Sequence, residues 1–196
     1  MRYRNLAFLL IGLIFISCGQ RKTETDSATD DKAQLSELVI NALKWHDKNS
    51  AYDGFEPVYN SEGLAVGMDL DILEKELDRF TESNLFDKEF IDNYSKIVRT
   101  IDKQIKSKEL VFTDEDMPPY GGADPWCNCQ DIPYENPWDN IIFDFLSLDS
   151  EKATFKWTWG DPTWDEYFTY LVEAKKTNET WKITYLEGFD FKLMTE

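Results

Sequence analysis

The chain has 196 residues, with 38 Asp and Glu against 21 Lys and Arg, and its formal net charge is −17. Proteins that bind nucleic acids need a basic face for the phosphate backbone, so this charge argues against a nucleic-acid partner. At 42% hydrophobic and 15% aromatic residues, the chain is too rich in large apolar side chains to be disordered. Its length predicts one domain with short additions.

The start of the chain is typical of a secretory signal. Arg2 and Arg4 form a positive start, an apolar run begins at Leu6, and Ser17 is a small residue before a cleavage point. A transmembrane helix needs about 20 apolar residues, and this run is shorter. We therefore predict that the protein is exported and that residues 1–17 are removed.

Cys18 directly follows this signal, and Phe15-Ile16-Ser17-Cys18 resembles the lipobox of bacterial lipoproteins. The resemblance implies that Cys18 is acylated and anchors the protein in the Gram-negative cell envelope, at the outer membrane because no Asp follows the Cys. The alternative is an incidental thiol behind an ordinary secretory signal. The polar residues 19–32 predict a flexible tether, which leaves residues 33–196 as one folded domain.

Apolar residues at helical spacing predict three helices in the first part of the domain. The first covers about residues 32–48. The second begins after Asp69, which is a typical N-cap residue, and the third covers about residues 87–107 with a continuous apolar stripe. Between the first two helices, residues 50–67 contain Gly, Pro and Asn and predict a break in regular structure.

Residues 113–136 predict a long irregular loop, because they hold several Pro and Gly and show no hydrophobic period. After this loop the period changes from 3.6 to 2, which predicts three or four antiparallel strands between residues 141 and 185. One face of these strands is polar and the other is strongly aromatic. Helices followed by a run of strands predict an α+β fold.

This order of elements resembles the nuclear-transport-factor-2-like fold, which is shared by SnoaL-like proteins and often called cystatin-like. In that fold a curved antiparallel sheet forms a cone around a long helix and leaves a pocket. Thr180-Trp181-Lys182-Ile183 resembles the last strands of the superfamily, and Asp124-Pro125-Trp126 followed by Gln130-Asp131 resembles a segment in small bacterial lipoproteins of this fold. The resemblance covers residues 32–191 and implies a pocket inside the cone.

The aromatic face of the predicted sheet supplies the candidate ligand pocket. One interpretation is a core packed against the third helix. The other is a half-open pocket for a sugar ring, a lipid or a peptide, because Trp and Tyr carry polar groups that need partners when they are buried. The candidate pocket residues are His46, Tyr94, Phe155, Trp157, Trp159, Tyr170, Trp181 and Tyr185.

His46 is the only histidine, so acid–base catalysis by an imidazole would have to use it. In SnoaL-like enzymes polar residues inside the cone do this work, and the resemblance would pair His46 with Tyr94 or Asp131. A single His on the apolar face of a helix is more often a structural residue, and we therefore expect no catalysis. Convergence of His46, Tyr94 and Trp157 on one cavity would favour the enzyme.

Cys127 and Cys129 are the two other cysteines. An oxidising compartment favours a disulfide between them, either as a loop staple or as a redox-labile bridge, and two unpaired thiols are the alternative. A zinc site is not expected, because the single His is far away in sequence. The acids near this loop match no calcium-binding pattern and predict a solvated surface. They are Asp114, Glu115, Asp116, Asp124, Asp131 and Glu135. We expect no metal and no cofactor.

These features predict an envelope-anchored lipoprotein that binds a small ligand in the aromatic cone, or binds an envelope partner, without catalysis. An alternative is an acidic inhibitor or immunity protein that captures a cationic protein, since the negative charge would speed that encounter. A SnoaL-like enzyme that uses His46 is the third hypothesis. The oligomeric state and the membrane face stay open.

Overall fold

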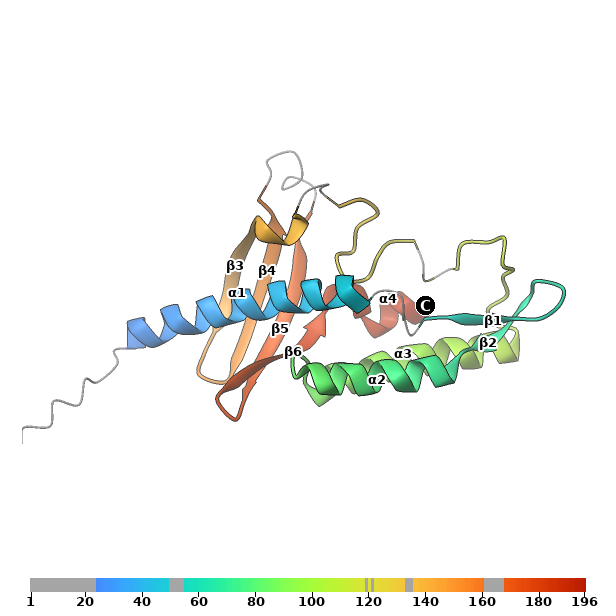
Figure 1. The fold of residues 1–196 in the computed structure, drawn as a ribbon, viewed down its shortest axis with the longest axis horizontal. Helices are drawn as coiled ribbons and strands as arrows, with labels where there is room; N and C mark the ends of the chain where they lie inside the picture. The colour runs from blue at the N-terminus through green and yellow to red at the C-terminus, as the bar shows by residue number, and fades with distance from the viewer. Residues whose placement is uncertain (1–23, 50–54, 119, 121, 133–135, 161–167) are drawn as a thin grey trace, which may run out of the picture.

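The computed structural model describes residues 24–49, 55–118, 120, 122–132, 136–160 and 168–196. Over these residues the protein is α+β, with helices first and an antiparallel sheet last, which confirms the predicted fold class (Figure 1). The predicted signal, Cys18 and the beginning of the predicted tether lie outside the described residues, and so does Glu135.

Four consecutive strands form the larger of the two sheets in the described residues. They are β3 (Ile141–Leu148), β4 (Lys152–Trp159), β5 (Tyr170–Thr177) and β6 (Thr180–Leu186), all antiparallel and in the order β3-β4-β5-β6. The predicted alternation is clearest on β4, where Phe155, Trp157 and Trp159 are buried on the inner face of the sheet and the residues between them are partly exposed. Trp157 lies between Phe143 of β3 and Tyr170 of β5 in the register.

Helix α1 (Glu24–Asn49) lies along this inner face (Figure 1). The helix already begins inside the segment predicted to be a tether, so residues 24–32 correct that prediction. The reason is a tertiary contact, because Asp31 is buried and its Oδ1 accepts hydrogen bonds from Trp181 Nε1 at 2.9 Å and Lys176 Nζ at 2.7 Å. A polar segment that suggested a solvated tether is therefore held against β6.

Helices α2 (Leu70–Ser83) and α3 (Lys88–Ser107) pack against each other beside the sheet (Figure 1). Asp69 is the N-cap that the sequence predicted, since its Oδ1 accepts hydrogen bonds from the N–H groups of Asp71 and Ile72. The link between the two helices runs along β6, where the N–H of Asp87 donates to the carbonyl oxygen of Ile183 at 2.8 Å. The main contact of α3 with the sheet is therefore with β6, while α1 contacts β6 and β3.

A small hairpin occupies part of the segment that was predicted to lack regular structure. Its strands are β1 (Pro57–Tyr59) and β2 (Ala65–Met68). The prediction is wrong here because strands this short show no measurable hydrophobic period. The hairpin is attached to α3 through the buried Asp102, whose Oδ1 accepts a hydrogen bond from the N–H of Met68 at 2.9 Å.

Three short helical elements complete the described structure, and none of them was predicted. They are η2 (Pro137–Asp139), η3 (Glu187–Phe189) and α4 (Phe191–Thr195). The last of these packs against α3 near the end of the chain. Among the helices of the described residues, none combines the length and the apolar character that crossing a bilayer requires.

Candidate functional site

The first group of aromatic side chains lies between η2 and strands β4 and β5, and we call it the tryptophan cluster. It consists of Trp138, Trp157, Trp159, Phe168 and Tyr170. Trp157 is perpendicular to Trp159 at a centroid distance of 5.1 Å, and Phe168 covers Trp157 at 4.9 Å. Phe168 is the member that is partly exposed. The cluster therefore joins three of the predicted pocket residues, Trp157, Trp159 and Tyr170, at one end of the sheet.

Two indole N–H groups of the tryptophan cluster have no acceptor within the described part of the chain. Trp157 and Trp159 are each 1% exposed, and the Nε1 atom of each is buried and unpaired there. By contrast, Trp138 Nε1 donates to Asp47 and Trp181 Nε1 donates to Asp31. A buried donor without an acceptor costs about 1–3 kcal/mol. The cluster thus contains two donors whose acceptor the described residues do not supply.

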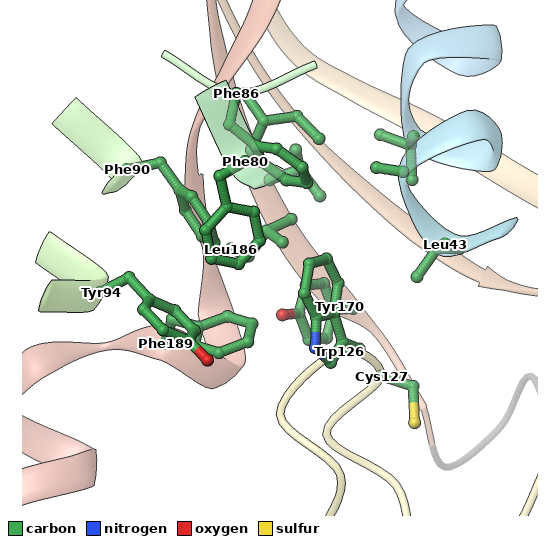
Figure 2. Packing of buried hydrophobic residues seen from close by; sticks show 14 of the residues in the cluster. Leu43, Phe80, Phe86, Phe90, Tyr94, Trp126, Cys127, Tyr170, Leu186 and Phe189 are labelled. Atoms are coloured by element: carbon green, nitrogen blue, oxygen red, sulfur yellow. The ribbon is translucent and has the colours of Figure 1, made fainter. Parts of the chain in front are cut away.

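The second group lies between α2, α3, η3 and the loop around Cys127, and we call it the phenylalanine cluster. It consists of Phe55, Phe80, Phe86, Phe90, Tyr94, Trp126 and Phe189, most of which Figure 2 shows facing one another. Tyr94 packs against Phe80 at 4.9 Å and against Phe189 at 5.5 Å. Tyr94, a predicted pocket residue, therefore belongs to a packed core away from Trp157.

His46 lies at the edge of the phenylalanine cluster. Its ring stacks on Trp126, with centroids 4.4 Å apart and planes inclined by 14°, and the side chain is 15% exposed. The charged neighbour is Asp124, whose Oδ2 is 3.8 Å from His46 Nε2, whereas Asp131 is exposed. His46 and Tyr94 thus both lie at the phenylalanine cluster, through Trp126 and Phe80 respectively, whereas Trp157 belongs to the tryptophan cluster. The described residues therefore do not show the convergence of all three on one cavity that the enzyme hypothesis required.

A disulfide joins Cys127 and Cys129 in the loop that carries Trp126. The loop is compact, since the N–H of Asp124 donates to the carbonyl oxygen of Cys129 at 2.9 Å and Asp124 Oδ1 accepts from the N–H of Trp126. Cys127 is fully buried, and Asn128 adopts a left-handed conformation at φ 53°. In this arrangement the bridge closes the turn that places Trp126 on His46, which matches the staple interpretation. The redox role stays a prediction.

Tyr170 connects this loop to the sheet. Its hydroxyl donates to the carbonyl oxygen of Pro125 at 2.7 Å and accepts from the N–H of Gly188 at 3.0 Å, and burial raises the pKa of Tyr170 well above its usual value. A Cβ atom on Gly188 would lie only 1.9 Å from the Pro125 carbonyl oxygen, so only glycine allows this approach. The loop therefore touches both clusters.

The remaining predicted pocket residues lie elsewhere. Phe155 stacks on Phe145 at 5.0 Å, and Trp181 is held by Asp31 beneath α1. The prediction that Tyr185 lies on the inner face with the other aromatic residues is wrong, because the pairing of β5 and β6 is irregular there. Ala174 pairs with Ile183, but the preceding residue, Glu173, pairs with Tyr185. The extra residue on β6 ends the alternation, so Leu186 is buried and Tyr185 is partly exposed.

A cavity of about 210 Å³ lies between the end of α3 and α4, and no member of the tryptophan cluster is among its lining residues. Its lining residues are Gln104, Glu109, Leu110, Tyr120, Leu193, Met194, Thr195 and Glu196. Sequence reasoning missed all of them, because three separate segments form the cavity and none carries a motif.

The described residues contain no group of three or more His, Cys, Asp or Glu side chains that could hold a metal ion. The loop acids instead support turns. Asp116 Oδ2, for example, accepts hydrogen bonds from the N–H and the hydroxyl of Thr113, and these bonds lower the pKa of Asp116. Comparison of the chain with protein-family models, with curated proteins and with solved structures finds no match in any of the three.

Proposed function

We propose that this protein is an envelope-anchored binding protein that holds a small ligand at the tryptophan cluster and catalyses no reaction. The observation that carries the proposal is the pair of buried indole N–H groups of Trp157 and Trp159 without an acceptor among the described residues. Because native proteins pair nearly all of their buried donors, such a pair is a specific exception that a ligand would explain.

The cluster defines the chemistry of this ligand. The members are aromatic rings, and the free polar atoms are two donors, so the ligand would offer a flat or apolar body and at least one hydrogen-bond acceptor, such as a ring oxygen or a carbonyl. Phe168 is the partly exposed ring over Trp157 and Trp159. A ligand would therefore enter by displacing the Phe168 ring from the two indoles.

The anchor is the second part of the proposal. Acylation of Cys18 would hold the protein at the outer membrane of a Gram-negative envelope. Since α1 begins at Glu24, only a few residues separate Cys18 from the helix, and a fully extended chain of that length spans roughly 20 Å. The domain would then stay close to the membrane surface. A nuclear-transport-factor-2-like cone also stays part of the proposal, and the four-stranded sheet with α1 along its inner face supports it.

Native mass spectrometry of the protein purified from envelope membranes tests the ligand. We expect a retained small adduct that disappears in the double variant Trp157→Phe/Trp159→Phe, which keeps aromatic rings but removes both N–H groups. The matched control is Trp138→Phe, whose N–H is already bonded to Asp47, and this variant should keep the adduct.

Indole ¹⁵N NMR decides the outcome if the adduct is lost during purification. A ligand on the cluster should move the Nε1–H signals of Trp157 and Trp159 on addition of an envelope extract and leave that of Trp181, which Asp31 holds, in place. A bare mass together with two unmoved indole signals would overturn the proposal.

A further inference from the structure

The cavity beside α4 has an apolar floor and an acidic rim. Leu110, Tyr120 and Met194 form the apolar part and pack against the hydrophobic core, while the Leu193 side chain is 74% exposed. A dry cavity of about 150 Å³ is enough to hold benzene in a protein. The present cavity, at about 210 Å³, therefore fits an apolar body of about one ring or a short branched alkyl group.

The charged groups of the lining are all negative. Glu109 and Glu196 contribute carboxylates, and no Lys, Arg or His is among the lining residues. The cavity also lies at the C-terminal end of α3, where the partial negative charge of the helix dipole favours a cation. The side-chain amide nitrogen of Gln104 is already engaged within the protein, because it donates a hydrogen bond to the carbonyl oxygen of Thr195 at 2.8 Å.

Basic groups outside the cavity lining have to be considered, and among the ion pairs of the described residues Lys192 is the one that reaches a lining carboxylate. Lys192 Nζ is 3.6 Å from Glu196 Oε2, but both side chains are largely exposed. Such a surface pair contributes at most about 1 kcal/mol and exchanges readily with a cation from solution. Glu196 is therefore available to a ligand that also buries apolar surface.

We propose that this cavity binds an amphipathic organic cation, with its ammonium group between Glu109 and Glu196 and its apolar body on Leu110, Tyr120 and Met194. The net charge of −17 raises the concentration of cations near the surface. The ligand is a free amine or a lysine side chain of a cationic protein, since both present the same chemistry. This inference concerns a site apart from the tryptophan cluster and does not depend on the ligand proposed there.

Benzylamine is the probe, and the methionine methyl groups report where it binds. In the purified full-length protein labelled with ¹³C-methyl methionine, we expect benzylamine to shift the Met194 signal and to leave that of Met117, which is exposed and outside the cavity lining, in place. Benzyl alcohol has nearly the same shape without the charge and should bind at least about tenfold more weakly, a difference of one unit in log Kd.

Two variants and a matched control separate charge from shape. Glu109→Gln/Glu196→Gln should weaken benzylamine binding by about tenfold and leave benzyl alcohol unchanged, because the variant removes only the attraction for the ammonium group. Glu115→Gln removes one exposed acid outside the cavity and should change neither affinity. A Met194 signal that benzylamine does not move, or equal affinities for benzylamine and benzyl alcohol, would overturn the proposal.

A second arm identifies the source of the cation. We use a short peptide with a central lysine and acetylated and amidated ends. If the natural ligand is a protein side chain, titration of the Met194 signal should give a lower Kd for this peptide than for benzylamine. The reverse order would assign the cavity to a free amine. Either order of affinity supports a cation site at this cavity. The result does not depend on whether an adduct is found at Trp157.

Discussion

The tryptophan cluster and the phenylalanine cluster are two ways of burying aromatic rings in one small protein. In the phenylalanine cluster several rings meet edge to face, as Phe80 does with Phe86 at 5.0 Å and with Tyr94 at 4.9 Å, and the described residues show no unpaired buried donor there. In the tryptophan cluster the rings are similarly close, with the centroids of Trp157 and Trp159 5.1 Å apart, but the N–H groups of these two residues find no acceptor within the described part of the chain. The two clusters therefore differ in whether their buried polar atoms are paired among the described residues, and this difference is the basis of the proposed ligand site.

The loop closed by the Cys127–Cys129 disulfide lies between these two clusters. It contributes Trp126 to the phenylalanine cluster and the Pro125 carbonyl oxygen to Tyr170 of the tryptophan cluster. The loop is therefore in contact with both clusters. The following experiments test the differences between the two clusters and the role of the loop.

The largest effect should come from breaking the phenylalanine cluster. Phe80 is fully buried and packs against Phe86, Phe90, Tyr94 and Trp126. Phe80→Ala removes these contacts and leaves a cavity, so the free energy of unfolding should fall by about 3–5 kcal/mol. Urea unfolding followed by far-UV circular dichroism measures the loss. A loss below about 1 kcal/mol would show that the cluster does not form the core of the domain.

The next effect compares two tryptophans that differ in hydrogen bonding. Trp181→Phe and Trp157→Phe remove the same atoms from buried sites, but only Trp181 donates to a buried carboxylate, that of Asp31. A hydrogen bond to a charged group contributes about 1.5–3 kcal/mol, so Trp181→Phe should cost more free energy of unfolding than Trp157→Phe by that amount. Equal losses in urea unfolding would mean that the Trp157 N–H also has a partner in the folded protein.

A smaller effect tests the loop between the clusters. Cys127→Ser/Cys129→Ser opens a very short covalent loop, and the entropy of loop closure gives a loss of about 1–2 kcal/mol in the free energy of unfolding. The His46 ring should then lose its stacking on Trp126, which proton NMR detects as a changed ring-current shift of the His46 Cε1–H. An unchanged shift would show that the contacts of Pro125 with Tyr170 and Gly188 hold the loop without the bridge.

The last prediction concerns two tyrosines whose raised pKa values change the stability at alkaline pH and leave it unchanged at neutral pH. Burial and then the charge of Asp190 raise the pKa of Tyr185 to about 12, and burial raises that of Tyr170 well above 10. Both pKa values are higher in the folded state, so the stabilisation is complete below pH 10 and is lost as the pH rises toward 12 and beyond. Tyrosinate absorbance at 295 nm, measured with unfolding free energies between pH 9 and 12, checks this. Tyr185→Phe should reduce the alkaline loss, and a wild-type stability that is flat over this range would contradict it.

The predicted α+β class and most of the regular elements follow from local patterns. Asp69 caps α2 as predicted, and α3 and β4 have the periods that the sequence indicated. The site could be predicted only in part. Trp157, Trp159 and Tyr170 come together because they lie on the inner face of adjacent strands, which alternation along each strand and pairing of neighbours make visible. His46 and Tyr94 could not be placed, because their neighbours come from distant segments.

Features that depend on a few neighbouring residues could thus be predicted from the sequence: helix periods, caps, strand alternation and the order of elements. The other features depend on contacts between distant parts of the chain, so they are visible only in the folded protein. The helical residue Asp31 is held by a hydrogen bond from Trp181, which is 150 residues away in sequence. Tyr185 lies off the inner face because the pairing between β5 and β6 is irregular. Which indole N–H finds an acceptor, and which carboxylates meet at the cavity beside α4, are decided in the same way.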